Sequence, residues 1–165
     1  MRAFRYFYAE PFPNSHMADT PTKNPFRETL RQAVGMQMTH TPSPVTNWLA
    51  PTLTEVGEDT LKMDFTVQEQ HTNPSGNVHG GAISALLDDI IGMNVWALGR
   101  EGTFVSVNLA VDFLGAAPTG TVLEASTRVV RNGRRVVNGE GEIRLKEDGR
   151  LIARATCNLL NKDLS

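Results

Sequence analysis

Cysteine is nearly absent from this sequence, since its 165 residues contain only Cys157. A single cysteine excludes a framework of internal disulfides and suits a reducing compartment, so we expect a cytoplasmic protein. Cys157 lies in an alternating run late in the chain, which favours a packed thiol over a nucleophile.

The sequence also has no large excess of charge of either sign and no long apolar run that is free of charges. The formal net charge is -2, and the Lys and Arg residues are scattered along the chain, so nucleic acid is not an expected partner. Two aspartates interrupt the longest apolar run, which excludes this run as a membrane span. The first 17 residues lack the sustained apolar region of a signal peptide.

Several reactive motifs are missing as well. The sequence contains no Gly-x-Ser-x-Gly, no His-Glu-x-x-His and no glycine-rich phosphate loop. Its four histidines do not have the spacing of metal ligands. We therefore expect neither a metal nor a separate cofactor.

The first 44 residues are predicted to form an N-terminal extension, followed by one globular domain over residues 45–165. Residues 18–25 are rich in Pro, Thr and Asp and are typical of a flexible lead-in. Apolar residues then recur at four-residue steps and predict a short amphipathic helix over residues 25–38. These residues are Phe26, Leu30, Val34 and Met38.

From Thr52 the apolar pattern changes to a period of two residues, which indicates β-strands. Asn132-Gly133 and Asp148-Gly149 are typical of β-hairpin turns. Within residues 135–145 polar residues alternate with apolar residues and glycines, so one face of the sheet is expected to contact water. The predicted strands cover residues 53–56, 60–67, 104–113, 121–130, 135–145 and 151–160.

A long helix is predicted over residues 82–98, between the second and third strands. It is apolar on nearly every face and should be buried. An antiparallel sheet of five or six strands packs most economically by wrapping around such a helix, which is the α+β hotdog architecture. One sheet covers only part of the helix, so we expect at least a homodimer.

Polar residues are concentrated at the start of this helix and in its middle. The loop over residues 73–81 carries an amide, an imidazole and paired glycines at a helix N-terminus, where unpaired N–H groups favour a developing oxyanion. Asp88 and Asp89 lie within the apolar helix, where a carboxylate loses hydration unless partners satisfy it. At least one of the two is therefore a candidate functional group.

The sequence resembles the PaaI-like hotdog acyl-CoA thioesterases over about residues 45–162. The resemblance implies hydrolysis of acyl-CoA to a free acid and coenzyme A, with coenzyme A as part of the substrate. It also implies self-association as a homodimer or a dimer of dimers. The residues that match the signature of this family are Asn73, Gly76, His79-Gly80-Gly81, Asp88-Asp89 and Val105-Ser106-Val107.

The resemblance assigns a role to each matching residue. Asp88 corresponds to the general base or nucleophile, and the N–H of Gly80 to the group that polarises the thioester carbonyl. Asn73 and Ser106 position water or substrate. His79 either orients the turn through a hydrogen bond or transfers a proton. A thioester has a good leaving group, so one oriented carboxylate and one N–H donor are sufficient.

The resemblance also implies two segments that contact coenzyme A. The first covers residues 113–118 and includes Phe113, Leu114 and Gly115. The family often has Ser-Pro in this segment, where this chain has Gly115-Ala116-Ala117-Pro118. The second is the turn that contains Arg131, Gly133, Arg134 and Arg135. Its arginines can bind phosphates through charge-assisted hydrogen bonds, although a solvated hairpin tip has the same composition.

Other interpretations remain open at this point. Asp88 is alternatively a structural carboxylate in a salt bridge between subunits. Asp89 lies about 100° further round the helix and is expected to be structural. The whole chain is alternatively a non-catalytic module that senses acyl-CoA, or a hotdog hydratase.

Overall fold

The computed structural model describes residues 24–164, so most of the predicted lead-in over residues 18–25 lies outside the described residues. Two short helices come first, α1 (Pro25–Gln32) and α2 (Pro44–Leu49). The remaining elements are β1 (Thr52–Val56), β2 (Thr60–Thr66), the 3₁₀ turn η2 (Glu69–His71), α3 (Gly80–Trp96), β3 (Phe104–Phe113), β4 (Val122–Asn132), β5 (Val136–Leu145) and β6 (Leu151–Asn161).

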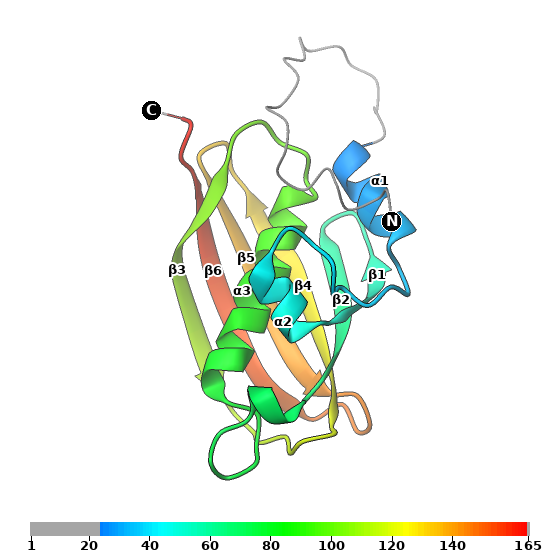
Figure 1. The fold of residues 1–165 in the computed structure, drawn as a ribbon. Coiled ribbons are helices and arrows are strands. Elements are labelled where there is room, and N and C mark those ends of the chain that lie inside the picture. Colours follow the sequence, from blue (N-terminus) through cyan, green and yellow to red (C-terminus); the bar gives the residue numbers. More distant parts are fainter. Residues whose placement is uncertain (1–23, 165) are drawn as a thin grey trace.

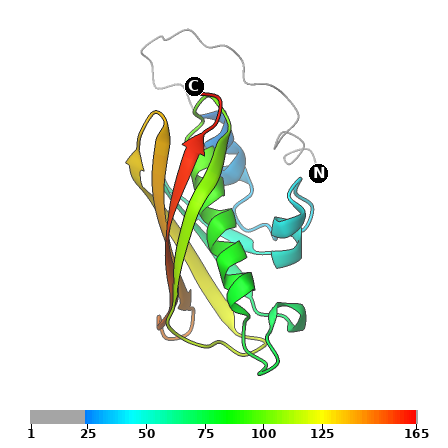
Figure 2. The ribbon, with the colours of Figure 1, turned by 90° about the vertical axis from the view of Figure 1, so that its left-hand side faces the viewer.

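The six strands form one antiparallel sheet in the order β1-β2-β4-β5-β6-β3. Helix α3 lies along one face of the sheet and contacts β2, β3, β4, β5 and β6 (Figure 1). Helix α2 lies on the side of α3 away from the sheet (Figure 2). The predicted hotdog fold is therefore confirmed, with six strands. None of the helices within residues 24–164 has the length and apolar composition needed to cross a bilayer.

Glycines in β5 let α3 approach the sheet closely. A Cβ on Gly139 would lie 2.6 Å from Cγ2 of Ile91, and one on Gly141 would lie 3.0 Å from Cδ2 of Leu87. Side chains larger than hydrogen at these positions would push the helix away, because protein interiors are close-packed. The polar residues that alternate with these glycines lie on the outer face of the sheet, as predicted.

The helix predicted over residues 25–38 is shorter in the structure. Helix α1 ends at Gln32, and Gly35 takes a left-handed φ of 87°. The chain then pairs with β1, since Gly35 N–H donates to Leu53 O at 2.7 Å and Leu53 N–H donates to Met36 O at 3.2 Å. The prediction beyond Gln32 was wrong because Gly35 turns the chain onto the edge of β1. This pairing covers one edge of the sheet and leaves β3 at the other.

Helix α1 is fixed to the C-terminal end of α3. Asn24 caps α1, and its side-chain Nδ2 donates to Ala97 O at 2.6 Å. The rings of Phe26 and Trp96 meet edge to face, with their centroids 4.7 Å apart. The residues before the sheet therefore pack against α3 through contacts that sequence periodicity does not indicate.

Candidate functional site

The loop before α3 is held in shape by Asn73. The side-chain Oδ1 of Asn73 accepts hydrogen bonds from Ser75 N–H at 3.0 Å and from Asn77 N–H at 3.2 Å. The loop is also tied to the segment after β3, because Val78 N–H donates to Ala117 O at 2.8 Å. The amide predicted to position substrate thus also orders the loop that carries it.

His79 is the N-cap of α3. Its Nδ1 accepts a hydrogen bond from Gly81 N–H at 2.8 Å, so in the neutral ring the proton is on Nε2. This is the orienting hydrogen bond predicted for His79. Gly80 N–H, by contrast, has no acceptor among the described residues. An unpaired N–H at a helix N-terminus is available to an incoming oxygen.

Asp88 lies in the middle of α3 and contacts Ser106 on β3. The hydroxyl of Ser106 donates to Asp88 Oδ1 at 2.7 Å. This contact joins two of the predicted site residues within one chain. It also fixes one carboxylate oxygen and leaves the other for water or substrate.

Ser106 reaches α3 because β3 contains a bulge. In a regular strand Ser106 and Asn108 would share one face. The register of β3 against β6 shifts between these two residues. Ser106 therefore pairs with Leu159, whose side chain is buried, and its hydroxyl turns toward Asp88. Alternation in the sequence gives no sign of this shift.

Asp89 has a different environment from its neighbour. The hydroxyl of Thr46, on α2, contacts both carboxylate oxygens of Asp89, at 2.8 and 2.9 Å. Burial raises the pKa of Asp89 from 3.8 to about 6; the hydrogen bond from Thr46 opposes this rise, and the charge of Asp88 adds to it. Asp89 therefore joins α2 to α3, which agrees with the structural role predicted for it. Thr46 was not predicted, since nothing near it in the sequence indicates a carboxylate partner.

The first predicted segment for coenzyme A lies beside the N-terminus of α3. A Cβ on Gly80 would lie 3.3 Å from Cε1 of Phe113, so the ring of Phe113 packs against Gly80. Leu114 and Gly115 follow, and their N–H groups donate to Ile152 O at 2.8 and 3.1 Å. Phe113 is also 56% exposed, so its ring is accessible at the end of the helix.

The second predicted segment, the turn between β4 and β5, lies at the opposite end of the subunit. Arg100, just after α3, donates to Gly133 O at 3.0 Å and to Asn132 O at 3.3 Å and holds the turn there. Sequence reasoning missed Arg100. The ten residues of β3 separate the two ends by about 30 Å. The ion pairs among residues 24–164 include none of the three exposed arginines of the turn, Arg131, Arg134 and Arg135.

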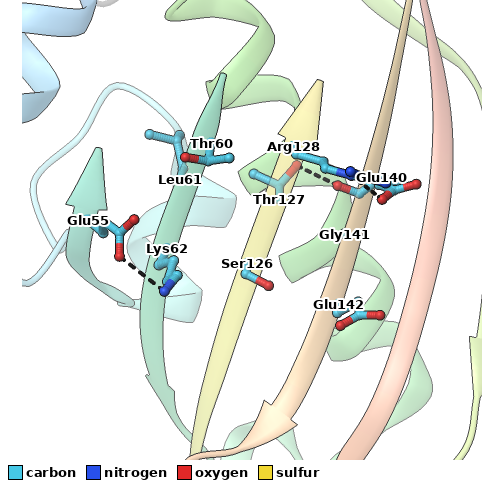
Figure 3. Close-up of a pocket in the computed structure, with 10 residues that line it drawn as sticks. All are labelled: Glu55, Thr60, Leu61, Lys62, Ser126, Thr127, Arg128, Glu140, Gly141 and Glu142. Carbon is cyan, nitrogen blue, oxygen red and sulfur yellow. Dashed lines mark hydrogen bonds and ion pairs between the residues drawn. The ribbon is translucent and has the colours of Figure 1, made fainter. Parts of the chain in front are cut away.

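A depression of about 310 Å³ on the outer face of the sheet is a different feature (Figure 3). Its charged side chains pair with each other, as in Lys62 with Glu55 at 3.0 Å and Arg128 with Glu140. The sheet separates it from α3, because Gly141 faces Leu87 while Glu140 and Glu142 face outward. We do not assign the site to this depression.

The curved sheet around one central helix defines a hotdog-fold protein, and comparison with known proteins narrows this class. Residues 75–152 match the thioesterase superfamily. The chain is 34% identical to "Putative esterase PA0474" of Pseudomonas aeruginosa over 125 aligned residues. These residues make up 74% of this chain and 91% of that protein. The chain belongs to the thioesterase superfamily.

Two further relatives are similar over shorter stretches. "Putative esterase F42H10.6" of Caenorhabditis elegans is 35% identical over 100 residues, which cover 61% of this chain and 59% of that protein. The chain thus spans about three fifths of the length of that relative. Human "Acyl-coenzyme A thioesterase 13" is 28% identical over 102 residues, which cover 62% of this chain and 73% of that protein.

Solved structures agree with this assignment. A "putative thioesterase, phenylacetic acid degradation-related protein" from Ralstonia eutropha JMP134 has a TM-score of 0.68 and 32% identity, covering 82% of this chain and 98% of that chain. A "hypothetical thioesterase protein with coenzyme A" from Streptococcus pneumoniae TIGR4 has a TM-score of 0.63 and 25% identity. The match covers 67% of this chain and 84% of that chain. The predicted family is confirmed, while the roles of the individual site residues stay predictions.

We predict that Asp89→Asn stabilises the fold at high pH. The folded state holds the Asp89 proton up to about pH 6, whereas the unfolded chain loses it near pH 4, so stability from this group is present below pH 4 and lost as the pH rises through 6. A pKa difference of about two units corresponds to roughly 2 to 3 kcal/mol in the free energy of unfolding at pH 8.

Urea denaturation at pH 8, 5 and 4 measures this effect. The gain from Asp89→Asn should shrink as the pH falls, and exposed Glu147→Gln should give no gain at any of the three values. An equal gain at pH 8 and pH 4 would contradict the assigned cause.

Proposed function

We propose that this protein hydrolyses acyl-CoA thioesters to the free acid and coenzyme A, with Asp88 as the general base or nucleophile. The observation that carries the proposal is the contact of Ser106 Oγ with Asp88 Oδ1 at 2.7 Å, in the middle of a largely apolar helix. The human relative named acyl-coenzyme A thioesterase and the streptococcal neighbour with coenzyme A support the choice of substrate.

In the general-base route, Asp88 takes a proton from water as the water oxygen attacks the thioester carbonyl carbon. The carbonyl oxygen becomes an oxyanion and accepts the hydrogen bond of Gly80 N–H, which has no acceptor among the described residues. The oxyanion then collapses, the C–S bond breaks, and Asp88 returns its proton to the leaving thiolate. Ser106 keeps the carboxylate oriented through the reaction.

We infer that two subunits share each site. Gly80 and Asp88 are eight residues apart in α3, a rise of roughly 12 Å. One carbonyl must lie within about 3 Å of the N–H donor and within hydrogen-bond reach of the carboxylate, directly or through one water. A single helix does not satisfy both conditions. In the proposed dimer the loop over residues 73–80 of one subunit faces Asp88 and Ser106 of the other.

The free edge of β3 supplies a surface for this dimer. In the described residues β3 pairs only with β6, and Val107 on β3 is 58% exposed. An edge strand of ten residues with apolar side chains is a template for pairing with another strand. Two β3 strands can pair in antiparallel orientation about a two-fold axis. The Phe113 end of one subunit then lies level with the turn between β4 and β5 of the other subunit, which carries Arg134. The two predicted segments for coenzyme A then belong to one site.

Two other functions use the same fold and are distinguished by experiment. A hydratase would add water to the double bond of crotonyl-CoA, which mass spectrometry separates from hydrolysis to crotonate and coenzyme A. A module that only senses acyl-CoA would bind it without releasing a thiol. A panel from acetyl-CoA to palmitoyl-CoA, with phenylacetyl-CoA and benzoyl-CoA, tests hydrolysis directly.

We predict that Asp88→Asn lowers kcat by about 100-fold to 10,000-fold, because the amide does not accept a proton from water or attack the carbonyl. The change is nearly isosteric, so the dimer and its melting temperature should be kept. Thiol release from the best acyl-CoA of the panel measures the rate, with Asp148→Asn in the turn between β5 and β6 as a control. Retention of more than about a tenth of the wild-type kcat would exclude the base and nucleophile roles.

We also predict that Arg134→Ala raises KM for acyl-CoA several-fold with a smaller change in kcat, because a phosphate contact far from the carbonyl contributes mainly uniform binding. The effect should shrink as the salt concentration rises. Arg31→Ala, which removes a surface arginine of α1 that pairs with Glu58 and is not part of the turn, is the control. An unchanged KM at low ionic strength would show that the turn is a solvent-exposed hairpin tip that does not contact coenzyme A.

A further inference from the structure

A second polar contact lies behind the hydroxyl of Ser106. The Sγ of Cys157, on β6, is 3.7 Å from Ser106 Oγ, within the longer range of hydrogen bonds that involve sulfur. Cys157 is 1% exposed, so the thiol reaches the site from the core side. On the same face of β6 its neighbours in the i±2 positions are Ala155 and Leu159, which have no polar side-chain atoms.

The chemistry of the three groups fixes the direction of both hydrogen bonds. The Asp88 carboxylate only accepts, so the single hydroxyl hydrogen of Ser106 points to Asp88. The oxygen of Ser106 then has lone pairs for a donor, and the S–H of Cys157 is that donor. Burial raises the pKa of Cys157, the charge of Asp88 adds to this, and the hydrogen bond with Ser106 opposes it. The group is therefore a thiol and not a thiolate at neutral pH.

We propose that Cys157 is a positioning residue for the proposed thioesterase site, donating its S–H to Ser106 Oγ and thereby fixing the Ser106 hydroxyl toward Asp88. A hydroxyl rotates freely among staggered positions when its oxygen has no partner. A donor behind the oxygen favours the one rotamer in which the hydrogen faces the carboxylate. The chain Cys157, Ser106 and Asp88 then holds the carboxylate oriented for water or substrate. This inference rests on the role proposed above for Asp88.

Infrared spectroscopy tests the contact without any need for activity. The chain has one cysteine, so its S–H stretching band belongs to Cys157. Ser106→Ala should move this band to higher frequency, because the thiol loses its acceptor. Asp88→Asn should move it less and in the same direction, since a neutral partner polarises the Ser106 oxygen less. Ile143→Val, in the core on β5, should leave the band in place.

Steady-state kinetics tests the positioning role. Cys157→Val removes the donor and adds about one methyl group of volume, and it should lower kcat by roughly 3- to 10-fold, the effect of one neutral hydrogen bond, while KM for acyl-CoA is kept. Cys157→Thr has the shape of valine with a hydroxyl, and should recover part of that kcat. Ile143→Val reports the effect of a core change alone, and should lower the melting temperature with kcat unchanged.

The outcomes separate this inference from the proposed function. An S–H band that does not move in Ser106→Ala or in Asp88→Asn overturns the inference, whether or not the protein hydrolyses acyl-CoA. A band that moves while Cys157→Val keeps the wild-type kcat also overturns it, because Cys157 is then only a packed thiol. Absence of thiol release by the wild-type protein contradicts the proposed function and removes the basis of the inference.

Discussion

The structure depends on the burial of α3, a helix that is apolar on nearly every side. The sheet covers one side of it, and Gly139 and Gly141 make that contact close enough to exclude larger side chains. Helix α2 covers a second side through Thr46. A strip that contains Ser84, Asp88 and Gly92 is only partly buried by the chain itself. The proposed active site lies on this partly buried strip of the helix. The proposed second subunit would bury the same strip.

Two adjacent carboxylates on this helix show how position decides function. Asp89 points to α2, is mostly removed from water, and has a pKa raised to about 6. It is best explained as a link between two helices, at a cost in stability above that pH. Asp88, one residue earlier, points to the edge strand and accepts a hydrogen bond from Ser106. A carboxylate near the surface with one oxygen fixed and one accessible is suited to proton transfer.

Much of this arrangement was predictable from the sequence, because it rests on local patterns. The period of two located the six strands, Asn132-Gly133 located a hairpin, and the matching motif located the loop and the helix. Features that depend on tertiary contacts were not predictable. Gly35 ended the first helix early by pairing the chain with β1, and a bulge turned Ser106 to the inner face. Arg100 and Thr46 act through residues more than 30 positions away in the sequence, and no spacing rule links them to these partners.

The central claim is that each site combines the loop of one subunit with Asp88 of the other. The most direct test mixes two inactive variants, Asn73→Ala and Asp88→Asn, after reversible dissociation of the subunits. In a heterodimer, the intact loop of the Asp88→Asn subunit meets the intact Asp88 of the Asn73→Ala subunit, so one site of two works. Random reassortment should then restore roughly a quarter of wild-type activity if the sites are independent. No recovery, with heterodimers seen by native mass spectrometry, would contradict the shared site and show that each subunit builds its own.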